Sequence, residues 1–331
     1  MYETPYHTKD LSQYSFLVTG GAGFIGSNIV EYLLKYRAGK VRVLDNFATG
    51  SHANIEEFKA NSAFVLLEGD IRDLETCRKA LEGIDYVSHQ AALGSVPRSI
   101  NDPITSNDVN VSGFLNMLVA ARDAGVKRMV YAASSSTYGD HPDLPKVEDK
   151  IGRPLSPYAI TKYVNELYGD VFSKTYDFHM IGLRYFNVFG PKQNPKGPYA
   201  AVIPLFIESA LKGETPFING DGETSRDFTF VENAVQANIK GMLVEKITQH
   251  EVVNIAFGER TTLNQLWSRI NEVAGTEIKV QYREERKGDV KHSLASIDKA
   301  MNLFSYSPKI DINEGLKKAF YFYQQKLDSY M

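Results

Sequence analysis

The stretch Phe16-Leu-Val-Thr-Gly-Gly-Ala-Gly-Phe-Ile-Gly26 decides the fold of this chain. Its first four residues form a mostly apolar run that predicts a buried strand, and apolar residues from 24 to 36 recur at helical spacing. Between these elements, Gly20 permits a tight turn, Gly23 lets the backbone approach a pyrophosphate, and Gly26 allows close packing. The free N–H groups at the start of the helix attract phosphates. The stretch therefore predicts a dinucleotide-binding turn.

Further short apolar strands, separated by helical patterns such as that over 109–124, follow this unit. The expected strands cover 41–44, 64–67, 86–89 and 128–133. Alternation of this kind predicts an α/β fold built on a Rossmann-type doubly wound parallel sheet.

The pattern changes after residue 190, where prolines and glycines crowd one stretch. Pro191, Pro195, Pro198 and Pro204 predict a long loop that leads to a smaller, mixed C-terminal substrate lobe. We expect three parts: an extension that packs on the surface or frays, a cofactor domain to which some later segments return, and the substrate lobe. Their boundaries are expected at 1–13, 14–190 and 191–331.

The composition limits the partners, the cellular setting and the metals that can be expected. The 331 residues carry a formal net charge of -3, which gives no argument for nucleic acid or a membrane surface as a partner. Cys77 is the one cysteine, so an internal disulfide is impossible and a reducing, cytoplasmic setting is expected. No apolar run approaches the ~18 residues that span a bilayer. Scattered histidines without ligand spacing predict that no metal is bound.

Acidic residues after the second and third strands indicate which dinucleotide is bound. Asp45 closes the second strand, where its carboxylate can accept the ribose hydroxyls of the adenosine and would repel a 2′-phosphate. NAD is therefore expected rather than NADP. Asp70 follows the third strand and is a candidate for the adenine amino group, or alternatively a turn or helix-capping residue.

A serine, a tyrosine and a lysine predict the chemistry beside the cofactor. Tyr158 and Lys162 are four residues apart, so on a helix they share one face. The lysine charge favours the phenolate, whose pKa is about 10 when unperturbed. Ser134 can hold the substrate oxygen whose proton is moved. An isolated Tyr-x-x-x-Lys pair is common by chance, but here it follows a serine-rich strand end and a complete cofactor motif.

Taken together, these motifs resemble the extended short-chain dehydrogenase/reductases, and among them the nucleotide-sugar 4-epimerases. The similarity runs from about residue 14 to about 325. It rests on the glycine turn and on Gly69-Asp-Ile-Arg-Asp73, His89-Gln-Ala-Ala92, Asn110-Val-Ser-Gly113, Ser134-Ser-Ser-Thr-Tyr-Gly139, Tyr158-x-x-x-Lys162 and Arg184-Tyr-Phe-Asn-Val-Phe-Gly190.

One departure sharpens the resemblance. Related 4,6-dehydratases carry an acidic pair directly after the catalytic hydroxyl residue, whereas this chain has Ser135, Ser136 and Thr137 there. Elimination of water then lacks its acid and base. Oxidation and reduction at one carbon remain, which is what an epimerase requires.

The resemblance also implies the residues that contact the cofactor and the substrate. Cofactor contacts are expected from Gly20, Gly23, Phe24, Ile25, Asp45, Asn46, Asp70, Ile71, Gln90, Ala91, Ala92, Asn110, Tyr158, Lys162 and Tyr185, with Asn110 in a supporting role behind the lysine. Substrate contacts are expected from Gly94, Ser95, Ser135, Asn187, Val202, Arg226, Arg286, Asp289 and Ser293. Two guanidinium groups, Arg226 and Arg286, would clamp a diphosphate.

The resemblance further implies a UDP-sugar substrate and a reaction. In the family, a tyrosine at the position of Ser293 restricts the pocket to plain hexoses, whereas a small residue admits an N-acetyl group. The chain is therefore expected to be an isomerase that interconverts UDP-N-acetylglucosamine and UDP-N-acetylgalactosamine through a 4-keto intermediate, as in polysaccharide biosynthesis.

Several alternatives stay open. The substrate could be UDP-glucose, or the uronic acid of an N-acetylated sugar if Arg98 reaches a carboxylate. The catalytic serine could be Ser135 or Ser136, although the spacing to Tyr138-Gly139 favours Ser134. A non-catalytic NAD-binding scaffold is a further alternative, which the intact triple argues against. A homodimer is expected through the helical segments 99–124 and 156–176.

Overall fold

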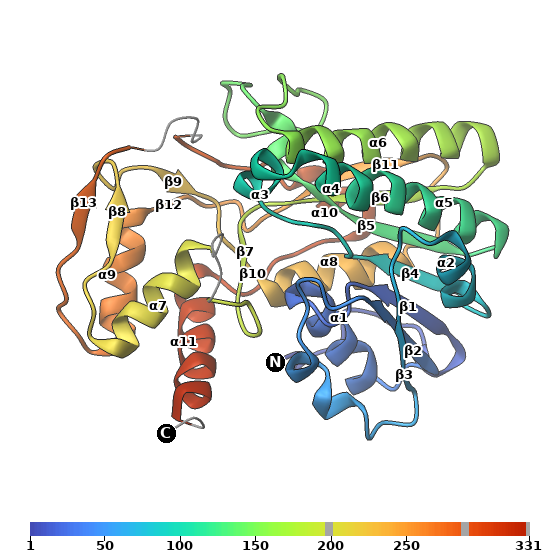
Figure 1. Ribbon diagram of the computed structural model, residues 1–331, viewed down its shortest axis with the longest axis horizontal. Coiled ribbons are helices and arrows are strands. Elements are labelled where there is room, and N and C mark those ends of the chain that lie inside the picture. Colours follow the sequence, from blue (N-terminus) through green and yellow to red (C-terminus); the bar gives the residue numbers. More distant parts are fainter. Residues whose placement is uncertain (196–200, 286–290, 329–331) are drawn as a thin grey trace.

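The computed structural model describes residues 1–195, 201–285 and 291–328, and its centre is a seven-stranded parallel sheet (Figure 1). The strand order is β11-β6-β5-β4-β1-β2-β3. The order reverses between β1 and β4, which is the point where a doubly wound sheet opens a crevice for its ligand. The strands are β1 (Ser15–Thr19), β2 (Lys40–Asp45), β3 (Phe64–Glu68), β4 (Tyr86–His89), β5 (Arg128–Ser134), β6 (Met180–Tyr185) and β11 (Glu251–Ile255).

Helices cover both faces of the sheet, because its strands are apolar on both sides. On one face, α1 (Phe24–Lys35) and α8 (Val231–Leu243) pack together over a core of residues such as Phe16, Ile29 and Val235. On the other, α2 (Leu74–Leu81), α5 (Gly113–Asp123) and α6 (Pro157–Tyr176) enclose Leu17, Phe114 and Met129. The predicted fold class is confirmed, and α8 and β11 are later segments that return to the sheet.

A smaller C-terminal lobe stands beside the sheet, at the left of Figure 1. Its core contains Phe206, Trp267 and Leu316 from three helices. The lobe consists of α7 (Val202–Lys212), α9 (Leu263–Ala274), α11 (Ile312–Asp328), β8 (Phe217–Asn219) and β13 (Gln281–Arg283), the last two being paired in parallel. Pro204, expected in a loop, lies instead in the first turn of α7, where its missing N–H costs no helical hydrogen bond.

Short elements link the lobe to the sheet. The small strands are β7 (Val188–Phe189) paired with β10 (Thr229–Phe230), and β9 (Ser225–Arg226) paired with β12 (Thr261–Thr262). The remaining helices are α3 (Val96–Asn101), α4 (Pro103–Asn107) and α10 (Asp298–Phe304), with 3-10 turns η1 (Leu11–Gln13), η2 (His52–Asn54), η3 (Glu56–Phe58) and η5 (Ser135–Tyr138) and a π-helical turn η4 (Asp108–Ser112).

The extension over 1–13 differs from the expectation of a surface or frayed segment. Tyr2 is completely buried and Leu11 is almost so. Both side chains join the core that contains α1, because large apolar side chains gain more from burial than the short segment loses in chain entropy. Across the described ranges, no helix is both long and apolar enough to cross a membrane.

Candidate active site

The glycine turn between β1 and α1 forms a cradle without side chains. Gly20 has a φ of +65°, and a Cβ on it would lie 2.8 Å from the backbone nitrogen of Ala91. A Cβ on Gly26 would collide with the carbonyl oxygen of Gly20. Gly23 precedes α1 and no side chain caps the helix, so its first N–H groups remain available for phosphate oxygens.

This cradle opens into a cleft of about 530 Å³ at the carboxyl ends of β1, β2, β4 and β5. Its volume suits a dinucleotide together with part of a second ligand. Most predicted cofactor residues line it: Gly20, Gly23, Phe24, Ile25, Asp45, Asn46, Asp70, Ile71, Gln90, Ala91, Ala92, Tyr158, Lys162 and Tyr185.

Asp45 lies at the end of β2, close to the glycine turn. Its carboxylate accepts hydrogen bonds from the backbone N–H of Ala22 (2.9 Å) and of Phe47 (2.8 Å), one on each oxygen. Burial raises the pKa of this carboxyl, and the two N–H groups oppose the rise. Each oxygen keeps a lone pair that ribose hydroxyls can use. The cradle and this carboxylate together fit NAD, and a 2′-phosphate would face a negative charge.

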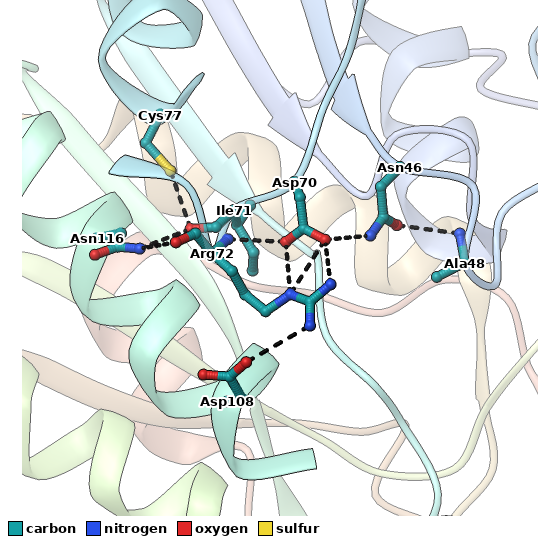
Figure 2. Close-up of polar contacts among 8 residues, drawn as sticks. All are labelled: Asn46, Ala48, Asp70, Ile71, Arg72, Cys77, Asp108 and Asn116. Atoms are coloured by element: carbon teal, nitrogen blue, oxygen red, sulfur yellow. Dashed lines mark hydrogen bonds and ion pairs between the residues drawn. The ribbon is translucent and has the colours of Figure 1, made fainter. Parts of the chain in front are cut away.

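Asp70 takes part in a dense set of contacts at the end of the cleft next to β3, where the adenine is expected (Figure 2). Arg72 donates to its carboxylate through Nε (3.1 Å) and Nη2 (2.8 Å), and Asn46 donates through Nδ2 (2.8 Å). These hydrogen bonds, that of Arg72 above all, lower the pKa of Asp70 to about 2. Arg72 also approaches Asp108 of η4 at 3.5 Å. Asp70 therefore orders its own turn besides facing the cleft.

Two further side chains in Figure 2, Asn116 and Cys77, bind the backbone of the same turn. Asn116 of α5 donates to the carbonyl oxygens of Ile71 (3.0 Å) and Arg72 (2.9 Å), and the Cys77 thiol donates to that of Ile71 (3.2 Å). Sequence reasoning missed Arg72, although its place two residues after Asp70 in one turn was an available signal.

The predicted catalytic triple comes together from two neighbouring elements. Ser134 ends β5, while Tyr158 and Lys162 lie on the first turns of α6 and face the same cleft. Helix α6 begins there because Pro157 occupies its first position and Ser156 caps the N–H of Ala159 at 3.1 Å.

Lys162 contacts the backbone rather than the tyrosine hydroxyl. Its Nζ donates to the carbonyl oxygen of Ala132 (2.8 Å) and lies 5.9 Å from the centroid of the Tyr158 ring. Burial lowers the pKa of Lys162 to about 8. Burial also raises the pKa of Tyr158, and a hydrogen bond with Ser134 opposes the rise. Burial is thus the larger of the two effects on the pKa of Tyr158.

The three adjacent serines take different places. The Ser134 hydroxyl accepts from the backbone N–H (3.2 Å) and the hydroxyl (2.9 Å) of Ser136. Ser135 lines the cleft, whereas Ser136 is not among its lining residues. This arrangement favours Ser134 as the serine beside Tyr158.

Asn110 lies next to α6. Its side chain accepts from the backbone N–H of Leu93 (2.8 Å), and donates to the Leu93 carbonyl oxygen (3.2 Å) and to Thr161 Oγ1 (3.2 Å). It joins the loop after β4 to α6 and lies outside the cleft lining. The π-helical turn that carries it is the kind of irregularity found at functional sites.

A network of side-chain hydrogen bonds holds two residues that line the cleft, Gln90 and Tyr185. Asn238 of α8 donates to Tyr185 Oη (2.7 Å) and accepts from Gln90 Nε2 (3.0 Å), while Tyr185 donates to Gln90 Oε1 (3.1 Å). Sequence reasoning missed Asn238, because the expectation that later segments return to the cofactor domain did not identify α8 as one of them.

A buried ion pair fixes α6 against β6. Arg184 donates to both oxygens of Glu166, through Nε at 2.9 Å and Nη2 at 2.8 Å. Glu166 lies one turn after Lys162. The two-pronged geometry, together with burial, sets the angle at which α6 presents Tyr158 and Lys162.

The expected substrate residues come from separate segments. Asn187 lines the cleft and donates to the carbonyl oxygen of Asp227 (3.3 Å). Arg226 is partly buried and donates to the carbonyl oxygens of Ser225 (3.0 Å) and Lys291 (3.2 Å). Ser293 is adjacent, because its backbone N–H donates to Ser225 O at 3.1 Å.

Asp227 joins these segments. Its carboxylate accepts the backbone N–H groups of Phe257, Gly258 and Ala295, each at 3.2 Å. Burial raises the pKa of Asp227 to about 7, and these N–H groups oppose the rise. The carboxyl thus holds the segment of residue 295, and with it Ser293, beside Arg226.

The remaining predicted residues are placed as follows. Gly94 lines the cleft, whereas the Ser95 hydroxyl accepts from the backbone N–H of Arg98 (3.2 Å) and caps α3. Val202 begins α7 and packs partly buried against the core of the C-terminal lobe. Arg286 and Asp289 lie outside the described residues. Within those described, no cluster of metal-ligating side chains is present.

The Rossmann sheet, the glycine cradle and the Ser-Tyr-Lys cleft define a dinucleotide-dependent enzyme. Comparison with known proteins places it more narrowly. Residues 16–256 match the model of the NAD dependent epimerase/dehydratase family, and the chain belongs to that family. The resemblance inferred from the motifs and the predicted cofactor, NAD, are both confirmed.

Similar proteins include 4-epimerases for different sugars. A solved UDP-N-acetylglucosamine 4-epimerase from Methanobrevibacter ruminantium M1, in complex with UDP-N-acetylmuramic acid, is 38% identical with a TM-score of 0.90, covering 96% of this chain and 100% of that one. A UDP-glucose 4-epimerase of Mycolicibacterium smegmatis is 33% identical, over 94% of this chain and 98% of its own. A UDP-glucuronic acid 4-epimerase from Bacillus cereus, solved with UDP-glucuronic acid and NAD, is 29% identical with a TM-score of 0.87, covering 94% and 99%. The chain is thus an enzyme of the epimerase class.

Proposed function

We propose that this protein interconverts UDP-N-acetylglucosamine and UDP-N-acetylgalactosamine. The observation that carries the proposal is the assembly of Ser134, Tyr158 and Lys162 in the cleft of the glycine cradle, with no acid at 135–137. Bound NAD supplies an acceptor, and then a donor, of one hydride, so the sugar undergoes no net oxidation.

The side chains of this site move the proton and hold the substrate. Tyr158 Oη takes the proton of the sugar 4-hydroxyl while C4 loses its hydride, which leaves a 4-keto sugar. Ser134 donates a hydrogen bond to the 4-oxygen, and the Lys162 charge favours the phenolate when the site is filled. The sugar turns over while Arg226 retains the diphosphate. Hydride then returns to the opposite face of C4, and Tyr158 gives the proton back.

The N-acetyl preference rests on Ser293. This side chain is small and lies beside the Ser225–Arg226 strand, where a larger residue would take space from a group on C2. The solved UDP-N-acetylglucosamine 4-epimerase, 38% identical to this chain, supports the same assignment.

The test is to incubate the protein without added NAD with UDP-N-acetylglucosamine, UDP-glucose and the UDP-N-acetylated uronate in turn, and resolve the products by NMR. We expect the N-acetylated hexosamine pair to interconvert fastest. Ser293→Tyr should reduce that turnover more than tenfold and spare UDP-glucose, while Ser268→Tyr, an exposed serine of α9, should change neither. Preference for UDP-glucose or the uronate overturns the substrate assignment, and no turnover at all overturns the epimerase.

The same proposal includes a homodimer. Ile104 of α4 and Ile160, Leu167 and Val171 of α6 are exposed by 82%, 52%, 49% and 52%, and these two helices pack side by side. A second copy would cover this apolar face. Light scattering should give twice the mass of one chain, and Leu167→Glu should give monomers; a monomeric unmodified chain would contradict the dimer.

A further inference from the structure

Residues 1–7, which precede the part of the chain matched by the family model, pack against the cofactor helix. We call this segment the leading arm. In Figure 1 its end lies between α1 and α11. Met1 contacts both the core of the sheet and that of the C-terminal lobe, and Tyr2 is completely buried with a φ of +61°. A tyrosine rarely adopts this backbone conformation, so the surroundings must stabilise it.

Every polar group of Tyr2 has a partner. Its N–H donates to Glu232 Oε1 (3.1 Å), and its carbonyl oxygen accepts from Tyr36 Oη (2.9 Å). Its own hydroxyl donates to the carbonyl oxygen (3.1 Å) and to Oδ1 (3.2 Å) of Asn28. Burial raises the pKa of Tyr2 far above its usual value, so the phenol remains a neutral donor.

Asn28 carries this contact to the cofactor cleft. It lies on α1, one turn after Phe24, which lines the cleft. Its Nδ2 donates to the carbonyl oxygens of Phe24 (2.9 Å) and of Pro191 (3.1 Å). Pro191 follows β7, whose Val188 also lines the cleft. Tyr2 therefore orients the side-chain amide of Asn28, which links the first turn of α1 to the segment that follows β7.

A second tyrosine of the leading arm strengthens the attachment. Tyr6 Oη donates to Glu232 Oε1 (2.9 Å), its N–H donates to Tyr32 Oη (2.7 Å), and its ring stacks on that of Tyr32 with centroids 5.2 Å apart. Glu232 begins α8 and approaches Lys318 of α11 at 3.6 Å. The leading arm thus joins α1, α8 and the C-terminal lobe.

We infer that the leading arm is a brace that preorganises the first turn of α1 for NAD and so retains the cofactor between turnovers, with Tyr2 as its positioning residue. The N–H groups of that turn must point at the pyrophosphate when NAD binds. If the turn frays in the free protein, the apparent affinity for NAD equals the intrinsic affinity multiplied by the fraction of molecules in which the turn is ordered. The hydroxyl of Tyr2 keeps that fraction high, because without it Asn28 Oδ1 would be buried with no donor.

Tyr2→Phe tests the inference, since it removes one hydroxyl and keeps the ring. We expect the NAD dissociation constant of the apoprotein to rise on the order of fivefold to tenfold, and less NAD to remain bound per chain after gel filtration. Hydrogen exchange in the apoprotein should accelerate at the amide of Ser27, whose N–H donates to the Gly23 carbonyl oxygen (3.0 Å) and so closes the first turn of α1. Ile270→Val, in α9 of the C-terminal lobe, is the control for a comparable loss of thermal stability.

The outcomes separate a brace from an ordinary packing contact. If Tyr2→Phe lowers the melting temperature as Ile270→Val does but leaves NAD affinity unchanged, the inference is wrong. If Tyr2→Phe fails to fold, Tyr6→Phe carries the same test through the Glu232 bond. Asn28→Ala should weaken NAD binding as well, and adding Tyr2→Phe to it should cause little further loss; full additivity would also overturn the inference. None of these measurements depends on which sugar is the substrate.

Discussion

The cofactor part of the cleft and the proposed substrate part, which consists of Arg226, Asp227 and Ser293 outside the cleft lining, are built in opposite ways. The cofactor part uses residues at the ends of parallel strands, such as Asp45, the last residue of β2, and Asp70, two residues after β3, and each accepts a hydrogen bond from a backbone N–H two residues on. In the proposed substrate part, Ser293 lies far in sequence from Arg226 and Asp227, and the Asp227 carboxylate holds the two segments together by accepting the N–H of Ala295. Because the cofactor residues are held by contacts within short segments, sequence motifs can predict them. The proposed substrate residues depend instead on packing between distant segments, which motifs do not show.

The largest effect expected from this comparison concerns the chemistry that the two parts share. Tyr158→Phe should lower turnover by about 10²–10⁴-fold because the proton acceptor is lost, while NAD remains bound because the glycine cradle is untouched. Turnover by NMR and bound NAD by absorbance after denaturation measure the two effects. Tyr176→Phe, at the exposed end of α6, should leave both unchanged. An active Tyr158→Phe protein would remove Tyr158 from the mechanism.

Removing the Asp227 carboxylate should disrupt the proposed substrate part and leave the cofactor part intact. Asp227→Ala leaves three backbone N–H groups without their acceptor, which we expect to cost about 2–4 kcal/mol of stability and to raise KM for the UDP-sugar. NAD affinity should change little, because Asp227 is outside the cofactor cradle. Denaturant unfolding and steady-state kinetics test this, with exposed Asp221→Ala as the control. Equal losses of NAD and sugar affinity would contradict the division into two parts.

Burial of the Lys162 ammonium group should lower the free energy of unfolding of the protein. Because burial lowers the pKa of Lys162 to about 8, the unfolded chain binds more protons than the folded chain between pH 8 and about 10.4, and stability rises with pH there. Lys162→Met should raise the stability of the apoprotein at pH 7 by about 1–3 kcal/mol and flatten that rise, while activity is lost.

Thermal unfolding from pH 7 to 10 measures this effect of Lys162. Lys174→Met, exposed on the same helix, should leave the profile unchanged. A Lys162→Met protein less stable than the unmodified chain at pH 7 would mean that its bond to the Ala132 carbonyl outweighs the burial of charge.

The smallest effect is expected at the adenine end. Arg72→Ala removes the guanidinium that holds Asp70, but this side chain is 44% exposed, so its ion pairs contribute at most about 1 kcal/mol. NAD affinity should fall about two- to fivefold, with no change in sugar KM. Calorimetric titration of the apoprotein measures it, and Arg78→Ala on α2 is the control. A change in sugar KM alone would place Arg72 in the other part of the cleft.

Local patterns were enough for much of this protein. The strand-glycine-helix stretch specified the Rossmann sheet, because alternation of apolar strands and helices has few packed solutions. Asp45 and the Tyr158–Lys162 spacing could be assigned to the cleft for a similar reason, since strand ends and helix turns fix where nearby side chains lie.

Other features were settled by tertiary structure, because they depend on contacts between distant residues. The sequence did not indicate that Asn238 supports Tyr185, that Lys162 donates to a backbone carbonyl, or that Asp227 joins residues 257–258 to residue 295. Sequence reasoning predicted an extension that packs on the surface or frays, whereas Tyr2 is buried against α1 as part of the core. Sequence periodicity determines elements and their faces, while the balance of burial, charge and hydrogen bonding at a site is decided only when the elements pack.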